Sequence, residues 1–370
     1  MASYQKRGKT WQYTISHTVN GKTQLIRKGG FNKRKEAEVA ATELEAQLNK
    51  GIVPHLVPIP IDEYFDNWVD LYKSTSITHT TMLHYEYTSK AIKSYFGSKP
   101  LQQIKRHDYQ AFLNDFGKNK SKETVEKVNS HIRACVQDAV EEQIIPHNFT
   151  RKAKLTWSTP QKKPEEKHLN FEESQALLKE LYKRLDQGLG YYLILLGLVS
   201  GMRFAEIIGL TRNDFNFKDS TITINKTWGY MKRSPEGFGP TKNEQSNRTI
   251  KIDKITMNEF KKLFLASANN LHQLVFYSQA SKYKVISNTN ANKLLRKILI
   301  ELGIESITMH GLRHTHASVL LYKKVSIHYI SERLGHADIN TTLSDYSHVI
   351  KELRENDEKE TIDIFESMVV

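Results

Sequence analysis

Proline is the residue that most constrains how this chain can fold, because two proline-marked stretches interrupt it. In the first, NKGIVPHLVPIP, three prolines prevent any helix from continuing through: Pro54, Pro58 and Pro60. The second, STPQKKPEEK, carries Pro160 and Pro164 among charged residues. A chain of 370 residues is long enough for two or three domains with cores of their own. We therefore predict three units, over residues 1–53, 59–157 and 168–370.

The charge and hydropathy of the chain exclude several classes of protein. The formal net charge is +13, and such a basic field is more typical of a nucleic-acid partner than of a membrane surface. The mean hydropathy is −0.55, and the longest apolar run, Tyr191 to Val199, is too short to span a bilayer. The first residues lack the apolar stretch of a signal peptide. A single cysteine, Cys135, excludes an intrachain disulfide and a Cys-rich zinc site. We expect a cytoplasmic protein that does not bind membranes.

The first unit has the pattern of a small β-sheet with one helix. TWQYTIS alternates, Asn20-Gly21 is a strong hairpin turn, and TQLIRKG follows as a second strand. KRKEAEVAATELEAQL is rich in helix formers. Ten basic residues against four glutamates give this unit a charge of +6. That charge fits a sheet that reads a DNA groove, and it also fits a solvated charged surface.

The middle unit has the pattern of a helical domain. Apolar and aromatic residues follow helical spacing in two segments: Ile61, Tyr64, Phe65, Trp68 and Tyr72, then Val125, Val128, Ile132, Cys135 and Ala139. Cys135 therefore faces a core, and we expect an inert packing residue and not a nucleophile. We expect the aromatic residues to lie in the core as well.

The last unit combines many helices with a small hairpin. Asn170 is a good N-cap with Glu173 three residues later, and the apolar helix around Tyr191–Val199 ends near Ser200-Gly201. TITIN (221–225) and RTIKI (248–252) alternate like paired strands, and from Asn290 onward the pattern is helical. The fold class is therefore mainly α with small β elements, α+β overall.

Unusual polar residues gather in four segments of this last unit. SGMRFAEIIGL, PTKNEQSNRTI, TMHGLRHTHAS and RLGHADINTTLSDYSHV supply six candidates: Arg203, Lys242, His310, Arg313, His336 and Tyr346. Two arginines can grip phosphate oxygens and stabilise a pentacoordinate phosphorane. A tyrosine can attack the phosphorus, and a lysine can protonate the leaving oxygen. This set predicts a phosphate site that needs no metal ion or other cofactor.

Each of these residues also has a plainer interpretation. Arg203 can form a helix-end salt bridge with Glu206, and a lone tyrosine or lysine is a weak signal in this composition. His310, His314 and His316 include an i, i+4 pair that resembles a metal-binding face. No HExxH motif and no nearby carboxylate cluster completes such a site, so we predict no metal centre. The absence of GxxxxGK[ST] argues against a nucleotide-driven motor.

Three of these segments together resemble a known family. SGMRFAEIIGL, HGLRHTHAS and LGHADINTTLSDYSHV are similar to the signature boxes of the tyrosine recombinases, the phage integrase family, in the family's order. The resemblance is strongest over about 168–350. It implies a mixed α/β catalytic domain, and it implies that the helical middle unit is the core-binding domain that closes a clamp around DNA. The first unit is similar to the arm-type DNA-binding domain of integrases from temperate phages and conjugative transposons, a three-stranded sheet with a helix.

The resemblance also implies roles for single residues. Arg203 and Arg313 would hold the scissile phosphate, and Tyr346 would form a 3′-phosphotyrosyl bond. His310 would assist as general base, His336 would occupy a position that is His or Trp in the family, and Glu206 would be a structural support. Lys242 fits the hairpin lysine best, with Lys226 and Lys232 as the fallback candidates. In the arm-type unit, the expected DNA contacts are Lys6, Arg7, Lys9, Arg27 and Lys28.

The implied function is site-specific recombination that integrates and excises a mobile element. The implied partners are double-stranded DNA with core and arm attachment sites, further copies of the chain in a homotetramer on DNA, and an excisionase or a host DNA-bending protein. The implied location is the nucleoid of a bacterial host. Two alternatives stay open: a type IB topoisomerase that relaxes DNA, and a catalytically silent DNA-binding regulator. The separate basic first unit argues for the recombinase.

The last ten residues, TIDIFESMVV, form an unusually apolar chain end. Ile362, Ile364, Phe365, Met368 and Val369 lie close together, whereas a free terminus is usually polar. Such a cluster should be buried, either on its own domain or on a neighbouring subunit. The resemblance favours the neighbour, because related recombinases pass this segment to the next subunit.

Overall fold

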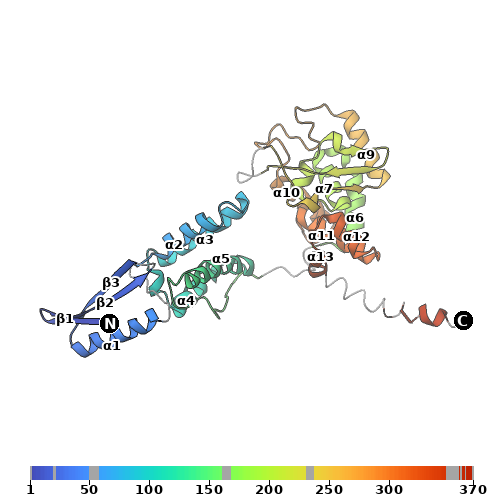
Figure 1. Ribbon diagram of the computed structural model, residues 1–370. Helices are drawn as coiled ribbons and strands as arrows, with labels where there is room; N and C mark the ends of the chain where they lie inside the picture. Colours follow the sequence, from blue (N-terminus) through green and yellow to red (C-terminus); the bar gives the residue numbers. More distant parts are fainter. Residues whose placement is uncertain are drawn as a thin grey trace. The chain divides into compact units, whose positions relative to one another are not determined.

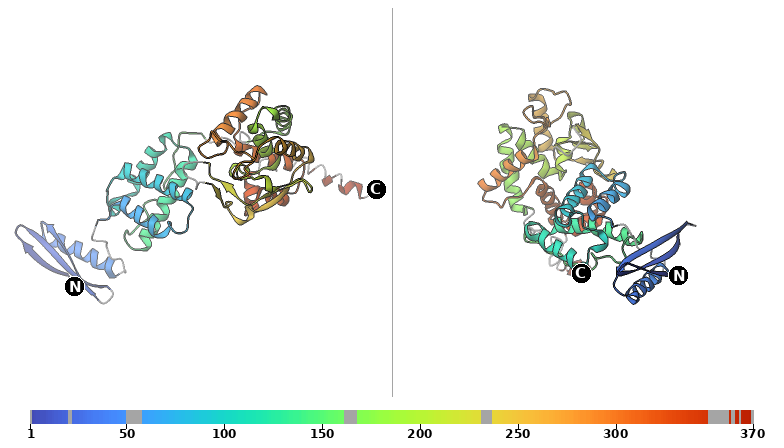
Figure 2. Two further views of the ribbon diagram at one scale, coloured as in Figure 1. Left: turned by 90° about the horizontal axis from the view of Figure 1, so that it is seen from above. Right: turned by 90° about the vertical axis from the view of Figure 1, so that its left-hand side faces the viewer.

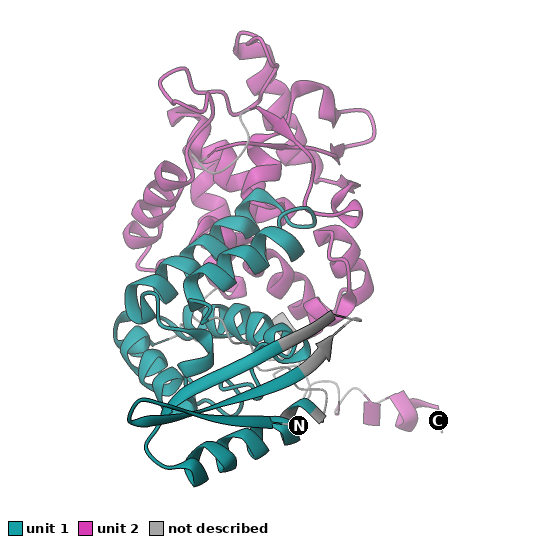
Figure 3. Cartoon of the chain, turned by 60° about the vertical axis from the view of Figure 1, so that its left-hand side comes forward, with its two compact units in different colours: residues 1–161 teal, residues 162–370 magenta. Residues whose placement is uncertain are grey.

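The computed structural model describes residues 2–19, 22–49, 58–160, 168–230 and 237–346, and in the tail residues 358, 361–362 and 364–368. The chain divides into two compact units, residues 1–161 and 162–370 (Figure 3). The first unit holds a small sheet domain and a helical domain, and each is described by itself below. Much of both proline-marked stretches lies outside the described residues.

The sheet domain at the start of the chain is an antiparallel meander covered by one helix. Its strands β1 (Ala2–Arg7), β2 (Thr10–Val19) and β3 (Lys22–Phe31) pair in the order β1-β2-β3, and α1 (Arg34–Asn49) lies along one face of this sheet (Figures 1 and 2). Tyr13, Ile15 and Ile26 pack against the small side chains of α1. The two strands and the helix predicted from the residue pattern are confirmed. The turn at Asn20-Gly21 lies outside the described residues.

The helical domain is a bundle around an aromatic and aliphatic core. Its helices are α2 (Ile61–Tyr72), α3 (His79–Phe96), α4 (Arg106–Phe116) and α5 (Lys122–Glu141), with short 3₁₀ turns η1 (Leu101–Gln103) and η2 (Gly117–Asn119). The apolar residues with helical spacing face inward, except that Tyr72 is exposed at the end of α2. Cys135 is buried among them, and burial raises the pKa of its thiol. The sequence correctly placed Cys135 in the core, where its thiolate is disfavoured.

An extended segment, residues 152–159, lies along α4 and is called the strap below. Gln110 pairs with the backbone of Lys154, donating to its carbonyl and accepting from its N–H at 2.8 Å each. Thr156 donates to the carbonyl of Leu113 at 3.1 Å. A Cβ on Gly117 would lie 1.9 Å from the carbonyl oxygen of Thr156, so the strap can approach only because this residue is glycine. The strap therefore belongs to the helical domain although it contains no helix.

The second unit is built around one buried helix, α7 (Leu189–Ser200). Nearly all of its side chains are apolar and buried, and it contacts α6, α8, α10 and α11. Gly201 ends it in the left-handed conformation, with φ of +67°. The other helices are α6 (Phe171–Lys183), α8 (Phe204–Ile208), α9 (Lys254–Ala266), α10 (Asn288–Glu301), α11 (Met309–Tyr322), α12 (Ile327–Leu334) and α13 (Ile339–Asp345), with 3₁₀ turns η4 (Leu185–Gln187), η5 (Arg212–Asp214) and η6 (Glu244–Ser246).

Two small sheets complete the second unit. Strands β4 (Phe215–Asn216), β5 (Thr221–Ile224) and β8 (Arg248–Lys251) form an antiparallel sheet, and β6 (Thr227–Trp228) pairs with β7 (Phe238–Gly239). The predicted pairing of TITIN with RTIKI is confirmed, since Ile222 lies opposite Ile250. The Asn170 cap is confirmed as a capping box with Glu173. Among the described residues, no helix is long and apolar enough to cross a membrane.

Candidate active site

Helix α11 carries the most deeply buried cation of the candidate set, Arg313. Its side chain is 3% exposed, and Nη1 donates to the carbonyl of Gly201 at 2.8 Å. The other terminal nitrogen, Nη2, is buried and has no hydrogen-bond partner among the described residues. Burial first and the nearby Arg203 second lower the pKa of Arg313 to about 9, so the group still carries its charge at neutral pH. A buried guanidinium with an unused donor is matched to an anion.

Arg203 lies directly before α8 and reaches three elements. Nη1 donates to Glu206 at 2.9 Å and to the hydroxyl of Ser246 at 3.1 Å, and Nη2 donates to the carbonyl of Gly335 at 3.2 Å. The plainer interpretation of Arg203 as the partner of Glu206 is thus present in the structure. It coexists with a position near Arg313, since the charge of Arg203 lowers the pKa of Arg313.

Glu206 is 1% exposed and lies between two arginines. Its second oxygen accepts from Nη2 of Arg248, on β8, at 3.0 Å. Burial raises the pKa of Glu206, but Arg248 and Arg203 lower it by more, so the net pKa falls below its usual value. The carboxylate is therefore charged, and it fixes both guanidinium groups in place.

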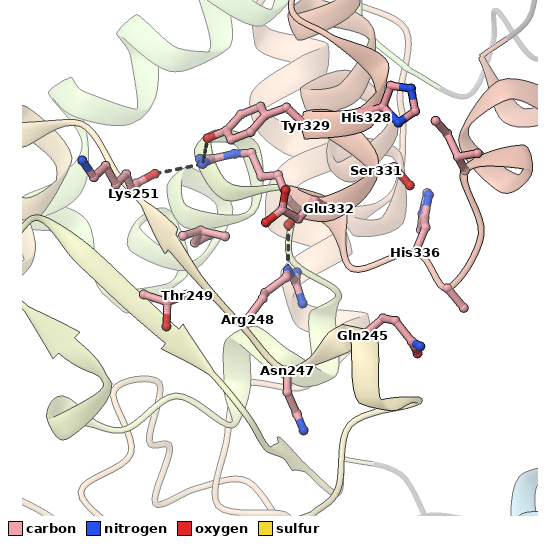
Figure 4. Close-up of a pocket in the computed structure, with 14 residues that line it drawn as sticks. Gln245, Asn247, Arg248, Thr249, Lys251, His328, Tyr329, Ser331, Glu332 and His336 are labelled. Atoms are coloured by element: carbon pink, nitrogen blue, oxygen red, sulfur yellow. Dashed lines mark hydrogen bonds between the residues drawn. The ribbon is translucent and has the colours of Figure 1, made fainter.

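A second chain of hydrogen bonds continues from Arg248 to α12 (Figure 4). Nε of Arg248 donates to the carbonyl of Arg333. Arg333 in turn donates to Nε2 of His316 at 3.0 Å, to the carbonyl of Lys251 at 3.0 Å and to that of Val199 at 3.2 Å. Arg333 therefore connects α12 with α11, β8 and α7.

His316 completes this connection as a neutral imidazole. Its Nδ1 lies 2.9 Å from the carbonyl oxygen of Leu198, which can only accept, so Nδ1 carries the proton. Its Nε2 is then free of a proton and accepts from Arg333. Burial, followed by the charge of Arg333, lowers the pKa of His316 to about 3.

The turn after α12 places His336. Gly335 has φ of +69°, and a Cβ there would lie 3.0 Å from Arg248 and from the carbonyl of Gln245, so glycine is required on both counts. Nδ1 of His336 lies 2.7 Å from the hydroxyl of Thr342. Burial, then Arg313 and Arg203, lowers the pKa of His336 to about 4, so this imidazole is neutral at pH 7. It lines a cleft of about 740 Å³ between β8 and α12 (Figure 4).

Tyr346 follows α13 and is 1% exposed. Its ring packs on apolar residues of α11 and α12: Ala317, Leu321, Ile330 and Leu334. Its hydroxyl lies 3.0 Å from Nδ1 of His314, and the rings of His314 and His310 meet edge to face at 4.9 Å. His310 itself is exposed.

The candidate lysine lies apart from these residues. Lys242 is exposed between β7 and η6, and its amine has no hydrogen bond or ion pair among the described residues. The fallback candidate Lys226 is held by both oxygens of Asp214, the longer contact being 2.6 Å. Lys232 lies outside the described residues.

The remaining predicted residues lie as follows. In the sheet domain, the five expected DNA contacts are all exposed: Lys6, Arg7, Lys9, Arg27 and Lys28. In the tail, Ile362, Ile364, Phe365 and Met368 are exposed, and Val369 lies outside the described residues. The described part of the chain contains no group of three or more His, Cys, Asp or Glu side chains arranged for a metal ion.

Sequence reasoning missed two kinds of contributor. Every second side chain of a strand points to the same face, and Ile250 and Ile252 are both buried. The alternation could therefore have shown that Arg248 also points inward. His314 was considered only as a metal ligand. Its contact with Tyr346 depends on how α13 returns to α11, and no local pattern reports that.

Comparison with known proteins connects this geometry to a family. Residues 167–352 match the phage integrase family, residues 2–48 match an arm DNA-binding domain, and residues 60–117 match an N-terminal SAM-like domain of phage integrases. A tyrosine recombinase XerC-like protein of Caldanaerobacter subterraneus subsp. tengcongensis is 27% identical over 98% of each chain. The integrase of Staphylococcus phage L54a is 26% identical over 86% of this chain and 97% of its own.

Solved structures share the fold. A Tn1549 transposon integrase in complex with a circular intermediate DNA superposes with a TM-score of 0.66 at 16% identity, over 81% of this chain and 99% of that chain. A lambda integrase tetramer bound to a Holliday junction gives 0.54 at 17% identity, over 88% of this chain and 89% of that chain. The family match alone spans half of the present sequence, and it contains every residue from Arg203 to Tyr346 discussed above. The chain therefore belongs to the phage integrase family, the tyrosine recombinases, whose members are site-specific recombinases.

Proposed function

We propose that this recombinase is an integrase that cleaves and rejoins double-stranded DNA through a 3′-phosphotyrosyl intermediate, integrating and excising a mobile element. The observation that carries the proposal is the buried, unpartnered Nη2 of Arg313 in the same cluster as Arg203, His336 and Tyr346. A DNA phosphate supplies the anion that this donor lacks.

Arg203 and Arg313 hold the scissile phosphate in this proposal. Their charges stabilise the extra negative charge of the phosphorane, as an oxyanion hole does. His336 is neutral at pH 7, so it donates a hydrogen bond to the phosphate without a change of charge. Glu206 holds the side chains of the catalytic Arg203 and the structural Arg248 in position. The chain thus supplies the positive charge itself, and the proposal includes no metal ion or other cofactor.

Tyr346 is the nucleophile and Lys242 the general acid. Attack of the tyrosine oxygen on phosphorus breaks the bond to the 5′ oxygen, and Lys242 protonates that oxygen as it leaves. His310, exposed on α11, assists as general base. The phosphotyrosyl ester keeps the energy of the phosphodiester, so the reverse reaction rejoins strands without ATP.

The remaining parts of the chain serve DNA recognition and assembly. The sheet domain binds arm sites through its exposed basic residues, and the helical domain binds core sites. We propose a homotetramer on DNA in which the apolar tail docks onto the next subunit, forming a ring of heterologous contacts. An excisionase or a host DNA-bending protein acts as an accessory partner, and the complex works on the bacterial nucleoid.

The test of the proposal is covalent capture. Footprinting on the DNA that flanks the gene locates the crossover sequence, and a nicked duplex with that sequence then traps the phosphotyrosyl intermediate. We expect the wild type to form the adduct and Tyr346→Phe to bind DNA normally but form none, because one oxygen carries the covalent step. Tyr329→Phe, an exposed tyrosine of α12, is the matched control and should form the adduct.

The outcomes separate the candidate functions. No adduct with the wild-type chain on any crossover duplex would indicate a silent DNA-binding protein. An adduct followed by relaxation of supercoiled DNA without exchange between two duplexes would indicate a topoisomerase. An adduct with Tyr346→Phe would move the nucleophile elsewhere.

A further inference from the structure

We infer that His314 is a catalytic residue of the recombination reaction: it accepts the proton of Tyr346 when the tyrosine attacks. This inference rests on the proposed function, because it takes Tyr346 as the nucleophile. The observation that carries it is the 3.0 Å contact between Nδ1 of His314 and the tyrosine hydroxyl, in a position where Tyr346 is 1% exposed. A general base must lie within hydrogen-bond reach of its proton, and His314 does so before any DNA is bound.

The fold makes this contact specific. Tyr346 is held from behind by Ala317 and Leu321 of α11 and by Ile330 and Leu334 of α12. His314 lies on α11, one turn before Ala317 and Leu321 begin to support the ring. Helix α11 therefore supports the ring of the nucleophile and also carries the imidazole at its hydroxyl.

The other titratable groups around His314 act differently. His310 lies on the same helix and contacts the His314 ring edge to face at 4.9 Å, and it is exposed, so its assistance as general base passes through the His314 imidazole. His336 has its Nδ1 on Thr342. Glu206 is bound by two arginines, so its oxygens are engaged. Lys242 is exposed on the hairpin segment.

The charges in the cluster also favour the transfer. Arg313 is close enough to Tyr346 for the tyrosine to raise the pKa of that guanidinium, and the same proximity stabilises a tyrosinate. Arg313 and His314 both influence His336, so these groups share one electrostatic environment.

The O–H bond of Tyr346 breaks and its proton moves to Nδ1 of His314, which becomes an imidazolium. The tyrosine oxygen forms a bond to phosphorus, the bond from phosphorus to the 5′ oxygen breaks, and that oxygen takes a proton from Lys242. Rejoining reverses each transfer, so His314 returns the proton to Tyr346.

A substitution at His314 can separate hydrogen bonding from proton transfer. In His314→Asn, the side-chain oxygen stands at the position of Nδ1 and can accept a hydrogen bond, but an amide does not take up a proton at neutral pH. The substrate is the crossover duplex with a sulfur at the 5′-bridging position, which leaves without protonation, so the rate reports only the tyrosine side of the reaction. We expect His314→Asn to slow adduct formation roughly 10²–10⁴-fold at pH 7.

The pH profile is the readout that a structural role would not change. For the wild type, the rate of adduct formation should fall at low pH as His314 becomes protonated and level off above that. For His314→Asn the plateau should disappear, and the rate should rise with the hydroxide concentration over the whole pH range. His314→Ala, which leaves a cavity of the shape of the ring, should show the same loss, and added imidazole should restore part of its rate.

The controls make failure informative. His272→Asn, an exposed histidine of the same unit, should keep the wild-type rate and profile. A His314→Asn protein that reacts within threefold of the wild type, or that is slow with an unchanged pH profile and no imidazole rescue in His314→Ala, would overturn the inference while leaving the recombinase function intact. If the wild type itself forms no adduct, the proposed function fails first.

Discussion

Lys242 differs from the other candidate residues because its amine is exposed and forms no ion pair among the described residues, whereas Lys226 is held by Asp214. An amine that protonates a leaving oxygen must be able to approach the bound DNA. We therefore expect Lys242→Ala to slow cleavage of an ordinary duplex by roughly 10²–10⁴-fold. The defect should vanish on a duplex with a 5′-bridging sulfur, because a thiolate leaves without a proton.

Lys226→Ala is the matched control for this experiment. It removes the ion pair with Asp214 and should therefore lower the stability of the protein. The ratio of its cleavage rates on the sulfur duplex and the ordinary duplex should stay close to that of the wild type. If the Lys242→Ala defect were equal on both duplexes, the acid would have to be another residue, with Lys226 or Lys232 next in order.

At the scale of single residues, the sequence predicted the charged groups better than their contacts. Arg203, Arg313, His336 and Tyr346 were singled out from three short segments, and the structure places them in one cluster. The partner of Tyr346 was not foreseen, because His314 and Tyr346 are separated by 31 residues of sequence and meet only through the packing of α13. Local pattern identifies chemistry, and long-range packing decides which groups touch.

At the scale of secondary-structure elements, the connection between Arg333 and His316 links α12 to α11, β8 and α7. His316 has a pKa of about 3 in the folded chain and about 6.5 when unfolded. Between pH 6.5 and pH 3, His316 therefore binds a proton in the unfolded state but not in the folded state. The contribution is fully present above pH 6.5, and the free energy of unfolding should fall by about 1.4 kcal/mol per pH unit as the pH drops toward 3.

His316→Asn tests this pH dependence. The variant lacks the titrating group, so its stability should lose that slope between pH 6.5 and 5. It should also be less stable than the wild type at pH 7, by about 1–3 kcal/mol, because a buried donor or acceptor is left unpaired. Hydrogen exchange of peptides from α11 and α7, corrected for its intrinsic pH dependence, measures the effect. An unchanged slope in the variant would assign it to other groups, such as His336.

Elements were predicted well wherever their signals were local. The Asn170 capping box, the Gly201 stop and the β5–β8 pairing all follow from residue type and alternation within a few positions. The first strand, β1, has few apolar residues and was reached only through the family resemblance. The strap was not foreseen at all, since its hydrogen bonds go to α4, more than 40 residues earlier.

At the scale of the whole molecule, the sheet domain should be separable from the chemistry. Its charge of +6 predicts an affinity for DNA that depends strongly on salt. A chain that begins at Ile59 should still form the adduct on a crossover duplex but integrate poorly, because it lacks the second DNA contact. Integration assays with both chains measure the difference, and equal integration would remove the arm-binding role from this domain.

The tail gives a second prediction at this scale. Its described apolar residues are exposed in the single chain, which leaves them available to another subunit. Deleting residues 361–370 should leave binding to one site nearly unchanged while weakening synapsis and recombination, as measured by gel shift and by strand exchange. A deleted chain that unfolds as a monomer would instead mean that the tail stabilises its own domain.

The strap has a consequence for anyone who recombines parts of such proteins. Helix α5 ends at Glu141, and a junction placed soon after it would look natural. Such a chimaera would replace, by a foreign segment, both the backbone of Lys154 that Gln110 contacts and the carbonyl of Thr156 that lies against Gly117. The segment up to Thr159 completes the helical domain. When this domain is exchanged between proteins, it therefore has to bring its own strap sequence with it, and the two chains have to be joined beyond Thr159.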